Sequence, residues 1–423
     1  MTTPLRYAPF RYLAGGRLVS MLGNAIAPIA LAFAVLDLTH SAGDLGLVVG
    51  ARSLTMVVFL LFGGVIADRL PRHLVMVASS GLAALSQGAI AVLVLTHSAT
   101  IPLLIGLSAI SGLTGAFAFP ASSALLPQTV PDSIRTQANA INRLGMNAAM
   151  IVGASAGGLL VAAVSPGWGL AIDACTFIAA AVLYSLVRVA DHRAEQNADN
   201  AEQRESTSTL YELRIGWREF VSRSWVWIVV LGFMFFNMAE TGAESVLGPT
   251  VADATFGRPA WGFILAAQTA GMVVGAFVVM RVKTRRLLLV GVACCVAPPF
   301  LLAALALAPY TVIMVPLAFI TGIAIEQFSV AWEVSVQEHV PADKLARVYS
   351  YDALGSMLVM PLGQVIAGPL AAVVGTETAL LIAAGVAMLS VVGMLSSRSV
   401  RTLEHRPSLP EPSPEPEPAI MTG

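Results

Sequence analysis

The sequence predicts an all-α membrane protein with twelve transmembrane helices in two six-helix halves. Three observations lead to this fold class. Apolar residues make up 57% of the 423 residues and charged residues only 12%, which is too apolar for a soluble globular domain. The apolar residues form twelve runs of roughly 20 residues, the length that a helix needs to cross the hydrocarbon core of a bilayer. The last six runs also repeat features of the first six.

The first run, from Leu18 to Leu36, contains no charged residue and has no small-residue cleavage site after it. It is too long for a secretory signal and is predicted to be a retained spanning helix. Five further runs complete the first half, at about 44–66, 74–96, 100–123, 138–163 and 168–188. The second half has six runs, at about 223–247, 259–280, 287–307, 310–333, 350–373 and 377–396. We therefore expect an N-terminal bundle at 1–188 and a C-terminal bundle at 223–397.

Two polar segments lie outside these bundles. Residues 189–222 are expected to be a linker, and the apolar spacing of 210–220 indicates a helix along the membrane surface. Residues 398–423 are rich in Pro and Glu and are expected to form a disordered tail. Nearly all Lys and Arg residues fall on one side of a twelve-span topology, so the positive-inside rule predicts an inner-membrane protein with cytoplasmic linker and termini.

An internal repeat supports the division into two halves. A shift of 210 residues superposes Val130-Pro131 on Val340-Pro341 and Gly158 on Gly368. Parallel six-helix repeats are typical of transporters whose substrate site lies near the bilayer midplane, between the halves.

The stretch GGVIADRLPRH at residues 63–73 resembles the loop between the second and third membrane helices of the major facilitator superfamily. FRYLAGGRLVSMLG, FAFPASSALLPQTVP and VPADKLARVYSYDALGSMLVMPLGQVIAGPLA resemble its branch of macrolide and enterobactin exporters. This resemblance implies a monomeric secondary transporter that exports an amphipathic small molecule, such as a drug, antibiotic or siderophore, by proton antiport through alternating access. An importer or lipid-type translocator of the same fold is the alternative, followed by a non-transporting membrane scaffold or sensor.

The resemblance also implies a gating motif at Gly64, Asp68, Arg69 and Arg72. Asp68 is expected to contact the positive N-terminal end of the eleventh helix. Arg69 and Arg72 are then expected to bridge to acidic groups such as Asp352. Simple anchoring of the basic residues on the cytoplasmic side is the alternative interpretation.

Carboxylates inside the spans are the leading functional candidates, because charge is costly in the membrane. Asn237, Glu240 and Glu244 share one face of the seventh span, and a proton bound there would relieve the repulsion between the two carboxylates. Glu244 could instead be solvated at the outer mouth. Glu326 lies deep in the tenth span with no local partner, which indicates a site for a proton or a cationic substrate.

The polar residues of the first two spans form a second group of candidates. Asp37 and Arg52 are expected to form a pair across these helices, with substrate contact as the alternative. Asn24 interrupts the first span near its middle, and Asp173 in the sixth span is expected to be wetted at the outer surface. The fifth span resembles the glycine-rich motif of antiporters but has Ala154 where that motif has proline. This motif therefore neither supports nor excludes proton antiport.

A substrate cavity is expected between helices one, two, four, five, seven, eight, ten and eleven. The aromatic residues expected to line it are Phe33, Phe235, Phe236 and Trp332.

Several function classes receive no support from the sequence. It contains no phosphate loop of the G-x-x-x-x-G-K-S/T type, and its histidines lack metal-ligand spacing. The three cysteines lie in apolar runs and suggest no disulfide framework. We expect no enzymatic activity, cofactor, metal or nucleic-acid partner. The expected partners are the small-molecule substrate, protons and the lipid bilayer.

Overall fold

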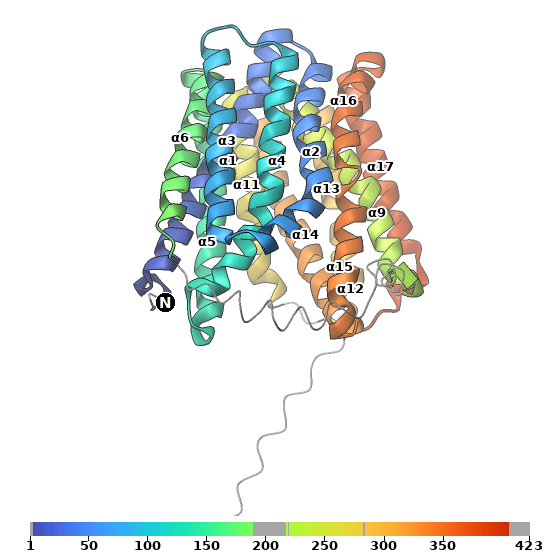
Figure 1. Cartoon of the computed structure of the whole chain (residues 1–423). Helices are drawn as coiled ribbons and strands as arrows, with labels where there is room; N and C mark the ends of the chain where they lie inside the picture. Colours follow the sequence, from blue (N-terminus) through green and yellow to red (C-terminus); the bar gives the residue numbers. More distant parts are fainter. Residues whose placement is uncertain (1–2, 189–216, 219, 282–283, 406–423) are drawn as a thin grey trace, which may run out of the picture.

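The computed structural model describes residues 3–188, 217–218, 220–281 and 284–405; within its helices, the side chains of 61–69, 342–343 and 346–347 are not described. Among the described residues, twelve helical segments are long and apolar enough to cross a membrane. They are arranged as two adjoining helical bundles (Figure 1). The predicted fold class is therefore confirmed.

The N-terminal half contains six long helices joined by short connections. They are α1 (Ala8–Thr39), α2 (Ala42–Arg69), α3 (Arg72–Leu95), α4 (Ile101–Leu125), α5 (Arg135–Ala163) and α6 (Pro166–Ser185). Within this half α1 packs on α5 and α6, and α4 packs on α2 and α3. Pro102 and Pro166 lie in the first turns of α4 and α6, where the missing N–H of proline has no helical partner to lose.

The C-terminal half has the same number of spans, but three of them are interrupted. Its helices are α9 (Ser224–Gly242), the π-helix η4 (Ala243–Leu247), α10 (Gly248–Ala254), α11 (Arg258–Val279), α12 (Leu287–Cys294), α13 (Ala297–Leu307), α14 (Thr311–His339), α15 (Ala342–Met357), α16 (Met360–Val374) and α17 (Thr376–Ser396). The seventh span continues from α9 through η4 to α10. Pro298 and Pro361 are the second residues of α13 and α16, so the predicted ninth and eleventh spans are each broken where a proline lies in the first turn of a new helix.

The ends of the two predicted polar segments differ from the expectation. Residues 217–218 and 220–222 are helical, and Phe220 is buried against the C-terminal half. Arg398–Arg401 form α18 with Val400 buried, so the packed chain continues beyond the predicted start of the tail. The rest of the linker and tail, 189–216 and 406–423, lies outside the described residues.

The buried apolar packing between the two halves lies at one end of the molecule. We call the end where α1 begins the N-terminal face and the other end the opposite face (Figure 1). One buried apolar cluster at the opposite face includes Phe33 of α1, Trp261 of α11 and Leu380 of α17. At the N-terminal face each half has its own cluster, around Phe10 in one and Trp225 in the other. The bundles are thus packed together at the opposite face and form separate cores at the N-terminal face.

Close helix contacts at the opposite face form what we call the seam, in which α2 packs on α16 and α5 packs on α11. A Cβ added at Gly262 would lie 2.5 Å from the carbonyl oxygen of Ala154. A Cβ added at Gly158 would lie 3.0 Å from the carbonyl oxygen of Arg258. These glycines allow the helix backbones to approach closely, which is the usual role of small residues between membrane helices.

Candidate functional site

A cavity of about 540 Å³ lies inside the N-terminal half. It extends from Ser123 and Asn139, near the N-terminal face, to Asn24 and Gln87 in the middle of their helices. Its described lining residues belong to α1–α6 and the short helix η2 (Leu126–Thr129), and none belongs to the C-terminal half. The lining of this cavity differs from the one expected between the two halves, because α3 and α6 contribute to it and no described residue of the C-terminal half does.

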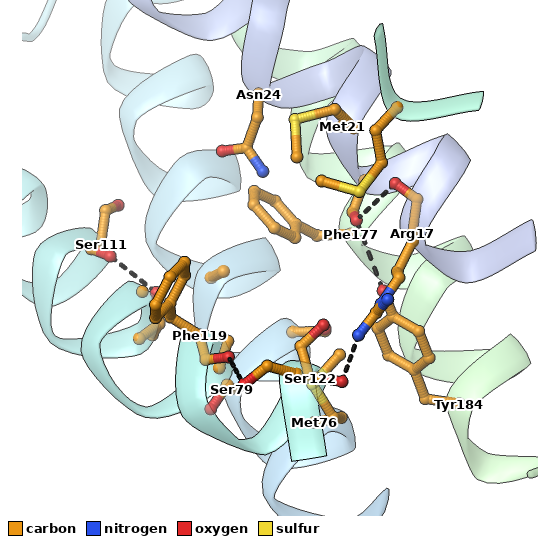
Figure 2. Close-up of a pocket in the computed structure, with 18 of the residues that line it drawn as sticks. Arg17, Met21, Asn24, Met76, Ser79, Ser111, Phe119, Ser122, Phe177 and Tyr184 are labelled. Carbon is orange, nitrogen blue, oxygen red and sulfur yellow. Dashed lines mark hydrogen bonds between the residues drawn. The ribbon is translucent and has the colours of Figure 1, made fainter. Parts of the chain in front are cut away.

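The cavity wall combines soft apolar groups with neutral polar groups and two arginines. Figure 2 shows Phe119, Phe177 and Tyr184 around the same space as Arg17. The sulfur-containing residues are Met21, Met56, Met76 and Met146. The neutral polar residues include Ser79, Ser80, Ser111, Thr114, Asn139 and Asn142. The volume and the mixed wall are typical of sites for drug-sized molecules.

Arg17 is the charged residue that the sequence analysis missed, since it was grouped with the basic residues outside the membrane. It lies in the tenth position of α1, is only 8% exposed, and donates a hydrogen bond through a terminal nitrogen to the carbonyl oxygen of Ser122 (Figure 2). Its Nε is buried and has no partner among the described residues. The available signal was helical spacing, because Arg17 lies two turns from Asn24 on the same face of α1.

Arg52 and Asp37 do not form the expected pair. Arg52 of α2 donates from a terminal nitrogen to Oδ1 of Asn24 at 3.4 Å and interacts electrostatically with Asp173. Asp173 is fully buried rather than wetted, and its Oδ2 accepts a 2.7 Å hydrogen bond from Nε2 of Gln87. The polar residues of α1, α2, α3 and α6 are therefore directed toward one another inside the bundle.

Asp37 instead contributes to the seam. Both of its carboxylate oxygens accept hydrogen bonds from Arg258 at the start of α11, one of them at 3.1 Å, and Nε of Arg258 also donates to Asp253 at 2.7 Å. The guanidinium carbon of Arg258 lies 4.9 Å from the ring centroid of Phe33, within the range of a cation–π contact. Arg258 lies just before the predicted span at 259–280, and its contact across the seam could not be read from local spacing.

Glu240 and Glu244 lie inside the C-terminal half, away from the cavity. Both line a space of about 10 Å³, room for roughly one water, whose wall includes Trp261. Glu240 is 8% exposed, and its Oε2 has no partner among the described residues. Glu244 is half-buried and belongs to the π-helix, a distortion that is often found at functional sites. Asn237 donates to the carbonyl oxygen of Ser356 at 3.2 Å, so it ties α9 to α15.

Glu326 has a partner that the local sequence does not reveal. A terminal nitrogen of Arg143, on α5 of the other half, lies 3.3 Å from Oε1 of Glu326 on α14. The Arg143 side chain is 71% exposed and that of Glu326 only 6%. The contact joins the two halves away from the seam, and it neutralises the carboxylate in this conformation.

The four expected cavity aromatics lie elsewhere. Phe33 is fully buried at the seam and Phe236 is buried in the C-terminal core, while Phe235 is 44% exposed. Trp332 packs its ring edge against Trp225. The wrong assignment follows from helix rotation, since a single aromatic residue does not reveal which face of a spanning helix meets the cavity.

The expected gating motif is described only in part. The side chains of Gly64, Asp68 and Arg69 lie outside the described residues. Arg72 donates to the carbonyl oxygen of Ala124 at 3.0 Å instead of bridging to Asp352. Asp352 accepts hydrogen bonds from Nε1 of Trp332 at 2.9 Å and from the hydroxyl of Ser356 at 3.2 Å. The expected bridge from Arg72 to Asp352 is therefore wrong for this conformation, in which the halves are apart at the N-terminal face.

Metal chemistry has no candidate site in the part of the chain that is described, because no cluster of three His, Cys, Asp or Glu side chains could hold an ion.

Comparisons with known proteins agree with the architecture. The family model of the Major Facilitator Superfamily matches residues 13–280 and 241–421. The chain is 26% identical, over 297 residues, to a protein named multidrug efflux pump Tap from Mycolicibacterium fortuitum, covering 67% of this chain and 70% of that protein. Its structure resembles that of the nucleoside transporter NupG, with a TM-score of 0.71, 14% identity, and coverage of 92% of this chain and 98% of NupG.

A second similar structure is a bacterial homologue of the human lysosomal transporter Spinster, solved in an inward-facing and unoccupied conformation. Its TM-score is 0.68 at 14% identity, and the likeness covers 93% of this chain and 97% of that one. At such low identity, both structural likenesses show the fold alone.

Proposed function

The chain belongs to the Major Facilitator Superfamily, whose members carry small molecules across membranes, and we propose that this transporter exports amphipathic small molecules in exchange for protons. The observation on which this proposal rests is the cavity of about 540 Å³ with its mixed wall of methionine, aromatic and neutral polar groups. Flexible thioethers adapt to ligands of different shape, as a site with broad specificity requires. The likeness to Tap, which is named as a multidrug efflux pump, supports the same direction of transport.

The conformation suits the loading step of an exporter. The seam closes the opposite face, while the cavity extends toward the N-terminal face, where the two halves have separate cores. The excess of basic residues at the N-terminal face supports a cytoplasmic location for that face. An exporter in this state would take its substrate from the cytoplasm or the adjoining leaflet and release it after the seam opens.

Glu240 and Glu244 are our candidates for proton coupling. They are the carboxylates that share a buried space of about one water inside the C-terminal half. A space of this size can hold a water molecule that carries a proton, whereas a drug-sized substrate cannot enter it. Their separation from the cavity favours a coupling role over substrate contact.

Accumulation of fluorescent dyes and drugs in energised cells that lack their own efflux pumps tests the proposal. Cells with the chain should accumulate less of at least one amphipathic compound than cells without it, and a protonophore should remove the difference. E240Q and E244Q should abolish the effect of the gradient, while E333Q, at an exposed carboxylate of α14, should leave it intact.

The remaining results would contradict the proposal in different ways. Higher accumulation with the chain would indicate an importer. Lower accumulation that persists without the proton gradient would remove proton antiport. Unchanged accumulation across a broad panel would refute the export of amphipathic drugs.

A further inference from the structure

Two arginines lie at different depths of the cavity in the N-terminal half. Arg17 is near the N-terminal face, and Arg52 is deeper, beside Asn24. Since Arg17 and Asn24 are seven residues apart on α1, the two levels are separated by about 10 Å along the helix. A ligand that enters from the N-terminal face would therefore meet Arg17 first and Arg52 second.

Both guanidinium groups have unused hydrogen-bonding capacity. A guanidinium group has five N–H donors. Among the described residues, Arg17 donates to the carbonyl oxygen of Ser122, and its buried Nε has no partner. Arg52 donates to Asn24 through a long contact of 3.4 Å. A charged group inside a membrane protein that lacks full pairing is costly, so its retention indicates a function.

No carboxylate among the described lining residues neutralises this pair of charges. The acidic group that interacts with Arg52 is Asp173, which is fully buried and is not itself a lining residue. It is held there by Gln87, whose amide lines the cavity and donates to it at 2.7 Å. Two guanidinium groups in the lining and one carboxylate outside it leave the cavity with an excess of positive charge.

We propose that this cavity recognises organic anions, with Arg17 and Arg52 binding the acidic group and the methionine and aromatic side chains holding an apolar body of drug-like size. The inference rests on the proposed transport function and narrows its substrate class, because an amphipathic cation would have to approach two guanidinium groups with no carboxylate among the described lining residues. A planar guanidinium matches a carboxylate, sulfonate or phosphate through paired hydrogen bonds. The acidic group can belong to a free molecule or to a lipid headgroup.

Binding to the purified protein tests the proposal without requiring transport. The probes are 2-naphthoate, 2-naphthamide and 2-naphthylmethylamine, which share one apolar body and differ in charge. Unfolding is followed with a thiol-reactive dye in a C175A background, since Cys175 is exposed whereas Cys295 is free and buried. A bound ligand raises the unfolding temperature. We expect 2-naphthoate to stabilise the protein at lower concentrations than the amide, and the amine not to stabilise it.

Variants show whether the two arginines cause this preference. R17Q and R52Q should each lower the affinity for 2-naphthoate about 10- to 100-fold, the loss expected for a hydrogen bond to a charged group. R17K and R52K should recover part of it, which also controls for misfolding of the glutamine variants. R401Q, at an exposed arginine outside the cavity, is the matched control and should bind as the unaltered protein does.

Several results would overturn the proposal. They are failure of 2-naphthoate to bind, equal binding of the three probes, or unchanged affinity in both R17Q and R52Q. A different result would identify the source of the acidic group. If dioleoylphosphatidylglycerol stabilises the protein more than dioleoylphosphatidylcholine does, and R52Q removes this difference, the acidic group belongs to a lipid. Failure of the transport proposal is distinguishable, because anion binding would then persist without gradient-driven export.

Discussion

Replacement of Gly262 by alanine is expected to shift the protein toward a conformation in which the seam is open. The new Cβ would lie 2.5 Å from the carbonyl oxygen of Ala154 and 3.0 Å from the Cα of Gly158, both on α5 of the other half. Both are backbone atoms, so no side-chain rotation relieves the contact. The helices α5 and α11 must separate by about 1 Å to restore an ordinary van der Waals distance.

Overpacking of this kind costs about 1–3 kcal/mol. The cost applies only while α5 and α11 are in contact, whereas the helix-propensity gain of alanine over glycine applies in both conformations and cancels. The equilibrium between closed and open seam should therefore shift about 5- to 150-fold toward the open state. G158A, whose Cβ would lie 3.0 Å from the carbonyl oxygen of Arg258, should give a smaller shift.

Distances between spin labels measure this equilibrium. Labels at Ser98 and Tyr310, exposed residues of the opposite face in different halves, should move apart when the seam opens. G385A is the matched control, because a Cβ at that position of α17 would meet nothing within 4 Å. Indistinguishable distance distributions for G262A and G385A would refute the claim that glycine packing keeps the seam closed.

Two further predictions concern charged contacts. D37N should favour the open seam by about 1 kcal/mol, since it weakens a partly exposed paired contact with Arg258, and the same labels measure the change. A closed population equal to that of the unaltered protein would contradict a role for this contact. D173N should lower the unfolding temperature, because it leaves Arg52 without a nearby counter-charge while Gln87 keeps an oxygen acceptor. Adding R52Q to D173N should raise the unfolding temperature again. A further decrease in the double variant would argue against coupling between Arg52 and Asp173.

The fold could be predicted almost completely because the membrane imposes a local rule. Every span must be an apolar helix of sufficient length, so composition and run length locate it without knowledge of tertiary contacts. The errors occur where a proline lies in the first turn of a new helix inside a run, as at Pro298 and Pro361. The end of the seventh span also differs, because α10 extends to Ala254 whereas the predicted span ended at about 247.

The site was less predictable because it depends on helix rotation and on contacts between distant segments. Asp37 and Arg52 are near in the chain, yet Asp37 pairs with Arg258 across 221 residues. Arg143 reaches Glu326 across 183 residues. Arg17 looked like an anchoring residue because positive charge near a helix start is common on the cytoplasmic side. Its burial follows from the packing of α1 against α6 and from its hydrogen bond to Ser122 of α4, contacts between distant segments that a single sequence does not encode locally.

The proposed proton site and the proposed anion site lie in different halves, so any coupling between them must pass through helix packing. Such a route exists: Gly242, between Glu240 and Glu244, lies so close to α16 that a Cβ there would be 2.5 Å from the carbonyl oxygen of Gly363. The helix α16 packs on α2, and α2 contains Arg52. Coupling needs an element with two states that both sites bias. The contact between α16 and α2 belongs to the seam, so a proton at Glu240 and an anion at Arg52 would act on one opening equilibrium without touching each other.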